Sequence, residues 1–313
     1  GVRAIVEHKD ADDEILQIDE VNAGAYWFNA SFLLEFLEEM TASNAQGEYY
    51  LTDSVEAAVS KGWRVDAYTA SPDTVLGAND RKTLSYLNQL AQKRVVARLL
   101  EEGVDIPFPD QVVVGPYVQI GPDTRLLPGT ILIGDTVIGA DCEIGPNTTI
   151  RNSRVGDGCT IVSSQVEDCV VGSKVKIGPM ARLRPGCHVG DKVKIGNFVE
   201  IKNSNIGEGT SVSHLTYVGD TDTGRWCNFG CGVVTVNYNG SQKYRTTIGD
   251  GVFIGCNTNL IAPVTLGDRV YCAAGTTVTD DVPSDALVIG RARQTVKENW
   301  NKDGKRFPKG NQS

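Results

Sequence analysis

From Val114 to Leu266, the chain repeats an aliphatic residue followed by glycine at intervals close to six or a multiple of six. This period fits neither a helix nor an ordinary strand. It is typical of a parallel β-helix, in which each short edge turns one aliphatic side chain inward. Three edges make one coil of about 18 residues, so residues 112–290 predict roughly nine or ten coils. The period does not determine the hand of the coil.

Before these repeats, the pattern is that of helices and a strand. Residues 31–40 predict an amphipathic helix capped by Ser31, and residues 53–62 predict a second helix that ends at Gly62. Residues 63–70 alternate like a strand. Helices that alternate with strands indicate an α/β domain.

A connecting helix of about six turns is expected over residues 81–103, where apolar residues recur at helical spacing. The chain then divides into an α/β part over 1–80, this helix, a β-helix over 104–292 and a basic tail over 293–313. The α/β part contains no glycine-rich phosphate-binding loop, so it is either a fragment or has lost nucleotide chemistry.

Composition narrows the possible partners. No apolar run approaches the roughly 20 residues that span a bilayer, and no signal peptide opens the chain, so a cytoplasmic location is the default. The net charge of −9 argues against nucleic acid or an anionic membrane as the main partner. The eight cysteines, all between Cys142 and Cys272, form no CxxC or Cys/His zinc pattern. We expect buried thiols inside the β-helix.

Several motifs resemble one bacterial family. "GVRAIVEHKDA", "LGANDRKTL", "ARLRPG", "SVSHLTYVGD" and "VNYNGSQKYRTTIGD" resemble the bifunctional N-acetylglucosamine-1-phosphate uridyltransferase/glucosamine-1-phosphate N-acetyltransferases. The resemblance implies a left-handed β-helix that forms a homotrimer, with acetyl-CoA sites between subunits, after a uridyltransferase domain that lacks its first part. It also implies transfer of an acetyl group from acetyl-CoA to glucosamine 1-phosphate, in the synthesis of UDP-N-acetylglucosamine for cell-wall precursors.

Acetyl transfer to an amine requires a base, because an ammonium group cannot attack a thioester. Histidine, with an ordinary pKa of about 6.5, is the natural candidate. The chain contains three, His8, His188 and His214. His214 in "SVSHLTYVGD" matches the family's catalytic histidine.

The acceptor phosphate calls for fixed cations and hydroxyl donors. By resemblance, Arg184 and Lys202 bind the phosphate, Tyr217 adds a hydroxyl group and Asn228 contacts the sugar. A coil of about 18 residues should bring Arg184, Lys202, His214 and Tyr217 close together.

The donor site should lie where the repeat is interrupted, because residues 235–247 must leave the prism as a loop. By resemblance, this loop supplies Asn237, Tyr238 and Lys243 to the active site. Backbone at Cys231, Cys256 and Ala274 lines a pantetheine channel, and Arg291 with the basic tail meets the CoA phosphates. Cys231 and Cys256 replace the family's usual Ala and Ser. The Cys231 N–H stays available for an oxyanion contact.

For the uridyltransferase half, Glu7, Asn22 and Asn79 match residues that contact UDP-N-acetylglucosamine. Asn79 also matches a Mg²⁺ ligand whose partner Asp lies upstream in the family and is absent here. We therefore expect an incomplete Mg²⁺ site and no uridyl transfer by this chain.

Three alternatives belong to other classes. A β-helix carbonic anhydrase needs three histidine ligands, and the repeats contain only His188 and His214. A sugar-nucleotide pyrophosphorylase fragment with a structural β-helix needs neither "SHLTYVGD" nor the loop over residues 235–247, but it does need the missing glycine-rich loop. Binding of acetyl-CoA would distinguish an enzyme from a non-catalytic trimeric scaffold.

Overall fold

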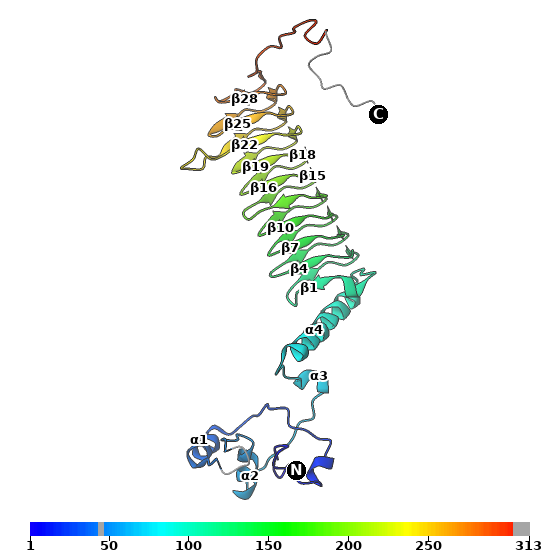
Figure 1. Cartoon of the computed structure of the whole chain (residues 1–313), viewed down its shortest axis with the longest axis vertical. Helices are drawn as coiled ribbons and strands as arrows, with labels where there is room; N and C mark the ends of the chain where they lie inside the picture. Colours follow the sequence, from blue (N-terminus) through cyan, green and yellow to red (C-terminus); the bar gives the residue numbers. More distant parts are fainter. Residues whose placement is uncertain (43–46, 303–313) are drawn as a thin grey trace. The chain divides into compact units, whose positions relative to one another are not determined.

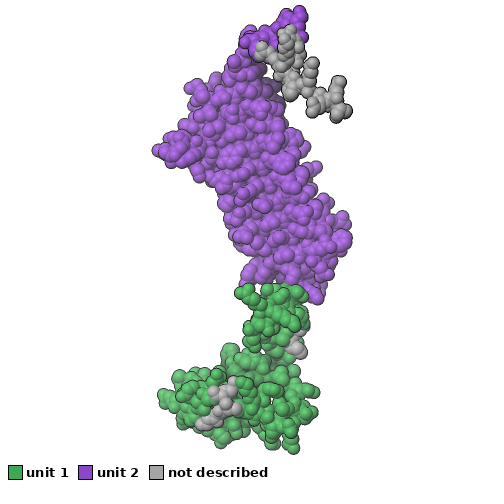
Figure 2. Space-filling view, viewed as in Figure 1, with its two compact units in different colours: residues 1–90 green, residues 91–313 purple. Residues whose placement is uncertain are grey.

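The computed structural model describes residues 1–42 and 47–302. The chain divides into two compact units, residues 1–90 and residues 91–313 (Figure 2). Each unit is described by itself. No helix in the described ranges is both long enough and apolar enough to cross a membrane.

The second unit is a left-handed β-helix of about ten coils, built from three parallel sheets (Figure 1). In spatial order, the β1 sheet contains β1 (Val113–Val114), β4 (Ile131–Ile133), β7 (Thr149–Arg151), β10 (Gln165–Glu167), β13 (Arg182–Leu183), β16 (Glu200–Lys202), β19 (Tyr217–Gly219), β22 (Val234–Val236), β25 (Asn259–Ile261) and β28 (Thr277–Val278). The β2 sheet contains β2 (Gln119–Ile120), β5 (Val137–Ile138), β8 (Arg154–Val155), β11 (Val170–Val171), β14 (His188–Val189), β17 (Asn205–Ile206), β20 (Thr221–Thr223), β23 (Thr246–Ile248) and β26 (Val264–Leu266). The β3 sheet contains β3 (Arg125–Leu126), β6 (Glu143–Ile144), β9 (Thr160–Ile161), β12 (Lys176–Ile177), β15 (Lys194–Asn197), β18 (Ser211–His214), β21 (Asn228–Phe229), β24 (Phe253–Ile254), β27 (Tyr271–Cys272) and β29 (Leu287–Val288). The predicted coils are confirmed.

The aliphatic residue of each repeat points into the prism. In the β3 sheet, Leu126, Ile144 and Ile161 stack on successive coils and are fully buried, while their strand neighbours Arg125 and Glu143 lie outside. Because burying one such side chain contributes about 1.5–3 kcal/mol, these ladders supply most of the stability of the unit.

One coil is interrupted where the sequence predicts, but the segment outside the strands covers residues 237–245 rather than 235–247, because both ends of the predicted loop pair in β22 (Val234–Val236) and β23 (Thr246–Ile248). Between β22 and β23, the chain leaves the prism as a hairpin, closed by an antiparallel bridge between Tyr238 and Lys243. Figure 1 shows it projecting beside β22.

In the first unit, the two predicted helices are α1 (Ala30–Glu39) and α2 (Asp53–Ser60); the short element η1 (Ile15–Gln17) precedes them and α3 (Pro72–Val75) follows them. The cap of α1 is Asn29, whose side chain accepts the Phe32 N–H at 3.2 Å, so the predicted Ser31 cap is wrong. Gly62 follows α2 at a φ of 79°, as its predicted role requires.

The predicted strand over residues 63–70 is also wrong. This segment is extended but unpaired, and residues 1–42 and 47–80 contain helices and no strand. A strand exists only through hydrogen bonds to a neighbouring strand, and the described part of this unit supplies none.

The predicted connecting helix is α4 (Arg81–Glu101), followed by η2 (Pro109–Gln111). Only Val96 and Leu99 of α4 are buried, and both join the core of the β-helix. Leu84, on the same predicted apolar face, is exposed.

Candidate functional site

The candidate base lies at the end of β18, where the β3 sheet turns toward the β1 sheet. His214 is exposed, and its Nδ1 lies 2.9 Å from Oδ1 of Asn197, the last residue of β15. Leu215 then takes a φ of 45°, which turns the chain toward Tyr217 at the start of β19. His214 and Tyr217 therefore flank one corner of the prism.

Three cations gather at the neighbouring β1 sheet, two from its coils and one from the hairpin. Lys202 follows Ile201, which pairs with Leu183, so Arg184 and Lys202 are neighbours on adjacent coils. The amine of Lys243 in the hairpin lowers the pKa of Lys202, with smaller effects of burial and of Arg184, whereas Asp220 opposes them. Arg184 also donates from Nη1 to Glu200 Oε1 at 2.8 Å. Cations held this close favour an anion such as a phosphate.

The hydroxyl group of Tyr217 lies next to this cation cluster. A Cβ on Gly219 would lie 2.4 Å from Tyr217 Oη, so the Tyr217 ring lies across Gly219. Because Gly219 pairs with Lys202, the hydroxyl group lies beside that lysine. Glycine is needed here because any side chain would displace the ring.

A buried carboxylate, that of Asp220, interacts electrostatically with two lysines of the cluster, Lys202 and Lys243. Asp220 is only 5% exposed, and its two oxygens accept from the side-chain amides of Asn203, at 2.5 Å, and Asn237. Burial raises the pKa of Asp220, but these amides and the charges of Lys202 and Lys243 outweigh it, so the net pKa is lowered. The sequence identified only Asn237; a signal for the other two was the 17-residue spacing along this ladder.

The base of the hairpin is fixed by an ion pair that the sequence did not indicate. Arg245 donates from Nε and Nη2 to the two oxygens of Asp222, at 2.7 and 2.5 Å, and from Nη1 to the Asn203 carbonyl at 3.2 Å. The guanidinium group is the main reason that the pKa of Asp222 is lowered, ahead of the opposing effect of burial. The base of the hairpin is thus bound to the preceding coil of the same prism, because Asp222 lies on β20, which pairs with β23.

The residues predicted to bind the acetyl donor, Cys231, Cys256, Ala274 and Arg291, form one line along the corner, called the donor line below. The Asn257 N–H donates to the Cys231 carbonyl at 2.8 Å, and the Gly275 N–H donates to the Cys256 carbonyl at 2.7 Å. Cys231, Cys256 and Ala274 therefore stack one coil apart. Arg291 extends the line, because its Nη1 donates to the Ala274 carbonyl at 2.5 Å.

This donor line begins beside His214. Val212 pairs with Phe229, and His214 and Cys231 each follow two residues later. Asn228 lies on the strand next to β18, but it pairs with Ser211 rather than His214. Tyr238 does not join the cation cluster through a hydrogen bond, since its hydroxyl group donates to Gly240 within the hairpin at 2.5 Å.

The expectation of buried thiols is correct for six cysteines and wrong for two. Cys256 is exposed and Cys231 is half-buried, and all eight thiols are free. Both exceptions occupy the outward-facing corner positions of the donor line, whereas Cys159 and Cys272 occupy positions that face the core.

The residues predicted for a UDP-sugar are not brought together by hydrogen bonds in the described ranges. Glu7 accepts from Thr52 Oγ1 at 3.3 Å, and Asn22 accepts the Gly24 N–H at 3.0 Å. Within residues 1–42 and 47–302, no group of three or more His, Cys, Asp or Glu side chains is arranged to hold a metal ion. The half Mg²⁺ site at Asn79 stays a prediction.

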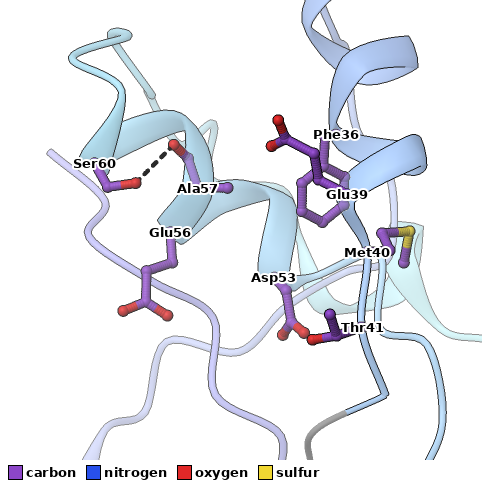
Figure 3. A pocket seen from close by; sticks show the side chains of 8 residues that line it. All are labelled: Phe36, Glu39, Met40, Thr41, Asp53, Glu56, Ala57 and Ser60. Carbon is purple, nitrogen blue, oxygen red and sulfur yellow. Dashed lines mark hydrogen bonds between the residues drawn. The ribbon is translucent and has the colours of Figure 1, made fainter.

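Two open hollows lie away from these residues. One of about 330 Å³ in the first unit is lined by side chains of α1, α2 and the segment after α1 (Figure 3), namely Phe36, Glu39, Met40, Thr41, Asp53, Glu56, Ala57 and Ser60. Another of about 590 Å³ adjoins Arg98, Tyr117 and Asp135. Neither is lined by a predicted acetyl-transfer residue.

Family models match the β-helix. Residues 117–152 and 168–203 match the model described as bacterial transferase hexapeptide (six repeats), and residues 245–280 match the model described as hexapeptide repeat of succinyl-transferase. A solved structure of Francisella novicida UDP-N-acetylglucosamine acyltransferase is 17% identical, with a TM-score of 0.34, over 65% of this chain and 74% of that one. That likeness is too weak to bear on function.

Curated relatives match nearly the whole chain. The bifunctional protein GlmU of Caldanaerobacter subterraneus subsp. tengcongensis is 49% identical over 300 residues, and that of Clostridium acetobutylicum is 45% identical over 300 residues. Both matches cover 96% of this chain and 66% of the relative. The chain thus spans just under two thirds of the length of these relatives.

Proposed function

Because this chain belongs to the GlmU family, we propose that its β-helix transfers an acetyl group from acetyl-CoA to the amine of glucosamine 1-phosphate. The product is N-acetylglucosamine 1-phosphate, on the route to UDP-N-acetylglucosamine and cell-wall precursors. The observation that carries the proposal is the exposed His214, one corner away from the cluster of Arg184, Lys202 and Lys243.

In the proposed reaction, the cation cluster and the Tyr217 hydroxyl group hold the acceptor phosphate, and Asn228 contacts the sugar. His214 takes a proton from the amine, whose nitrogen then attacks the thioester carbonyl carbon. A C–N bond forms, the C–S bond breaks, and the departing CoA sulfur takes the proton from His214 and leaves as the thiol. The Cys231 N–H stabilises the negative charge that develops on the carbonyl oxygen.

The donor runs along the corner from His214 toward Arg291. Backbone at Cys231, Cys256 and Ala274 follows the pantetheine arm, and Arg291 with the basic tail binds the CoA phosphates. Residues 303–313 of that tail lie outside the described residues. Mg²⁺ belongs to the uridyl transfer that the family resemblance implies, and no step at this corner uses it.

We also propose that the active unit is a homotrimer in the cytoplasm, with its acetyl-CoA sites between subunits. The support is the exposure of Cys256 and Ala274, since a site along an exposed corner gains shelter from a second prism. Arg245 and Asp222 fix only the base of the hairpin, to the preceding coil of its own prism, which leaves its tip available to cover a neighbouring subunit.

A thiol-release assay with acetyl-CoA and glucosamine 1-phosphate tests donor, acceptor and reaction together. We expect release of CoA that depends on both substrates, and its absence would contradict the proposal. The pyrophosphorylase alternative gives no role to His214 or to the gathered cations.

Shared sites are tested by mixing His214→Ala subunits with subunits truncated after Ala286. Mixed trimers should regain part of the activity that each parent lacks. A fully active monomer would contradict a site between subunits.

A further inference from the structure

Two strands of the β-helix are longer than the rest. β15 and β18 each have four residues, whereas the other strands of the described ranges have two or three. Their last residues, Asn197 and His214, form a pair in the ladder, and the Leu215 N–H donates to the Asn197 carbonyl at 3.1 Å. The extension therefore reaches as far as the candidate base and places an amide side chain next to its ring.

Gly196 makes this extension possible. A Cβ at Gly196 would lie only 1.9 Å from the Ser213 carbonyl oxygen, a distance that real Cβ atoms do not adopt. Glycine alone lets the two backbones approach this closely just before Asn197 and His214. The close approach and the 2.9 Å contact between Nδ1 and Oδ1 thus have one structural origin.

The direction of that hydrogen bond, meaning which partner donates, decides which ring nitrogen can act as a base. If Nδ1–H donates to the amide oxygen, the lone pair of the neutral ring resides on Nε2. If the amide Nδ2 donated to Nδ1 instead, Nε2 would carry the hydrogen and could accept nothing. An amide oxygen also accepts from both the neutral and the protonated ring, more strongly from the latter, so the contact persists while His214 gains and loses a proton.

We infer that Asn197 is a positioning residue for His214, and that its amide oxygen fixes the tautomer in which Nε2 takes the proton of the acceptor amine. The inference rests on the proposed acetyl transfer. Asn197 does not touch the reacting atoms and acts only through the imidazole ring.

Charged groups on the surrounding elements do not replace this contact. Lys194 on β15 pairs with Ser211, and Tyr217 across the corner pairs with Glu200, whose carboxylate is bound by Arg184. Cys231 is the titratable neighbour on the following coil. Among the described residues, the hydrogen bond of the His214 side chain is the one to Asn197.

The test compares Asn197→Ala and Asn197→Asp with a control from the same strand, Lys194→Ala, whose side chain is exposed. Rates of CoA release are measured against pH and against both substrates. Asn197→Ala should lower kcat by about tenfold to a hundredfold, which is less than the whole general-base contribution of 10²–10⁴. The KM values should change by less than about twofold, because a residue that acts only through the imidazole ring adds no binding contact to either substrate. Lys194→Ala should match the wild type.

Asn197→Asp is the more specific variant, because it keeps the shape and an acceptor oxygen while adding a negative charge. A carboxylate favours the charged form of the ring. The acid limb of the pH–rate profile should therefore move to higher pH, by up to about one unit, while most of the turnover is kept on the alkaline side. An unmoved acid limb in Asn197→Asp, or wild-type kcat in Asn197→Ala, would overturn the inference.

Titration of the histidine Hε1 signals by NMR separates this inference from the proposed function. In Asn197→Asp, the His214 signal should titrate at higher pH than in the wild type, with those of His8 and His188 unchanged. This readout does not require turnover. If the wild type released no CoA, the proposed function would fail, and a shifted or unshifted His214 titration would still support or overturn the role of Asn197.

Discussion

The β-helix and the first 90 residues bury apolar side chains in different ways. On successive coils of the β-helix, inward residues such as Ile144 and Ile161 are completely buried. In the first unit, the buried cluster is small, centred on Phe32 and Phe36, and Trp27 is fully exposed. A repeat covers each coil with its neighbours in the chain, whereas two short helices can cover only one face of each other.

The same difference governs the polar residues. In the β-helix, residues that the sequence separates by one coil become neighbours, so Asn203, Asp220 and Asn237 form one ladder. In the first unit, Glu7 and Asn22 hydrogen-bond to other groups and not to each other. In a repeat, spacing along the chain directly sets position in space. The candidate catalytic and binding residues of this protein lie in the β-helix, where this holds.

The largest expected effect separates the histidines of the two units. His214→Ala should lower the rate of acetyl transfer by roughly 10²–10⁴, because a positioned general base contributes that much. His8→Ala, in the first unit, should leave the rate unchanged, and His188→Ala on β14 should do the same. Steady-state assays of the three variants check this, and near-normal turnover by His214→Ala would remove that residue from the mechanism.

The next effect concerns stability, with one leucine taken from each unit. Leu260 on β25 is fully buried, whereas Leu34 on α1 is 66% exposed. Leu260→Ala should lower the free energy of unfolding by about 2–5 kcal/mol, because it leaves a cavity between coils. Leu34→Ala should change it by no more than about 0.5 kcal/mol. Urea unfolding followed by circular dichroism measures both, and equal losses would show that the two units do not differ in this way.

A smaller effect is expected from the carboxylate beneath the cation cluster. Asp220→Asn replaces one acceptor oxygen with an NH₂ group that faces another amide donor, so we expect a loss of about 1–3 kcal/mol at neutral pH. Burial raises the pKa of Asp220, but the amides of Asn203 and Asn237 and two lysine charges outweigh it and lower the net value. The stability that the ionised form contributes is therefore present above the unfolded pKa of about 3.9 and is lost as the pH falls through the lower folded value.

Unfolding of wild type and Asp220→Asn at neutral and strongly acidic pH tests this sign. The difference between the two proteins should shrink in acid. A difference that does not depend on pH would mean that the charge of Asp220 contributes nothing.

Asp53 on α2 should behave in the opposite way. Its pKa is raised, first by burial and then by Glu56, Asp10 and Glu7. A raised folded pKa gives stability that is fully present below the unfolded value and is lost as the pH rises through the folded value. Asp53→Asn should therefore make the first unit slightly more stable at neutral pH, as hydrogen exchange of α2 amides can measure. A loss of protection would contradict the direction of the shift.

The smallest energetic effect comes from the two accessible thiols. All eight cysteines lie in the β-helix, so maleimide labelling reports on that unit alone. Cys256 should react first and Cys231 second, while the six buried thiols should react only after unfolding. Acetyl-CoA should slow both reactions if the donor follows this corner, and mass spectrometry of the labelled peptides identifies the sites. Labelling of Cys159 in the folded protein would contradict the burial.

Local sequence was sufficient for much of the fold. The repeat of aliphatic residues and glycine determined the β-helix and its number of coils, and apolar spacing determined α1, α2 and α4. The interruption after β22 located the hairpin, whereas Cys231, Cys256 and Ala274 were assigned to the donor site by family resemblance, and the paired register places them one coil apart. Each of these features depends on neighbours that are close in sequence or one repeat away. The left hand of the coil followed from family resemblance rather than from the period.

The tertiary structure decided the features that depend on a particular partner. Residues 63–70 alternate like a strand but have no neighbour with which to pair, and Asn29 rather than Ser31 meets the first free N–H of α1. The contacts of Asn197 with His214 and of Asp222 with Arg245 join residues 17 and 23 positions apart. Coils differ in length, and one contains the hairpin. Which residues stack on neighbouring coils therefore depends on the paired register and on close backbone approaches such as that of Gly196. A repeat period alone does not determine either of these.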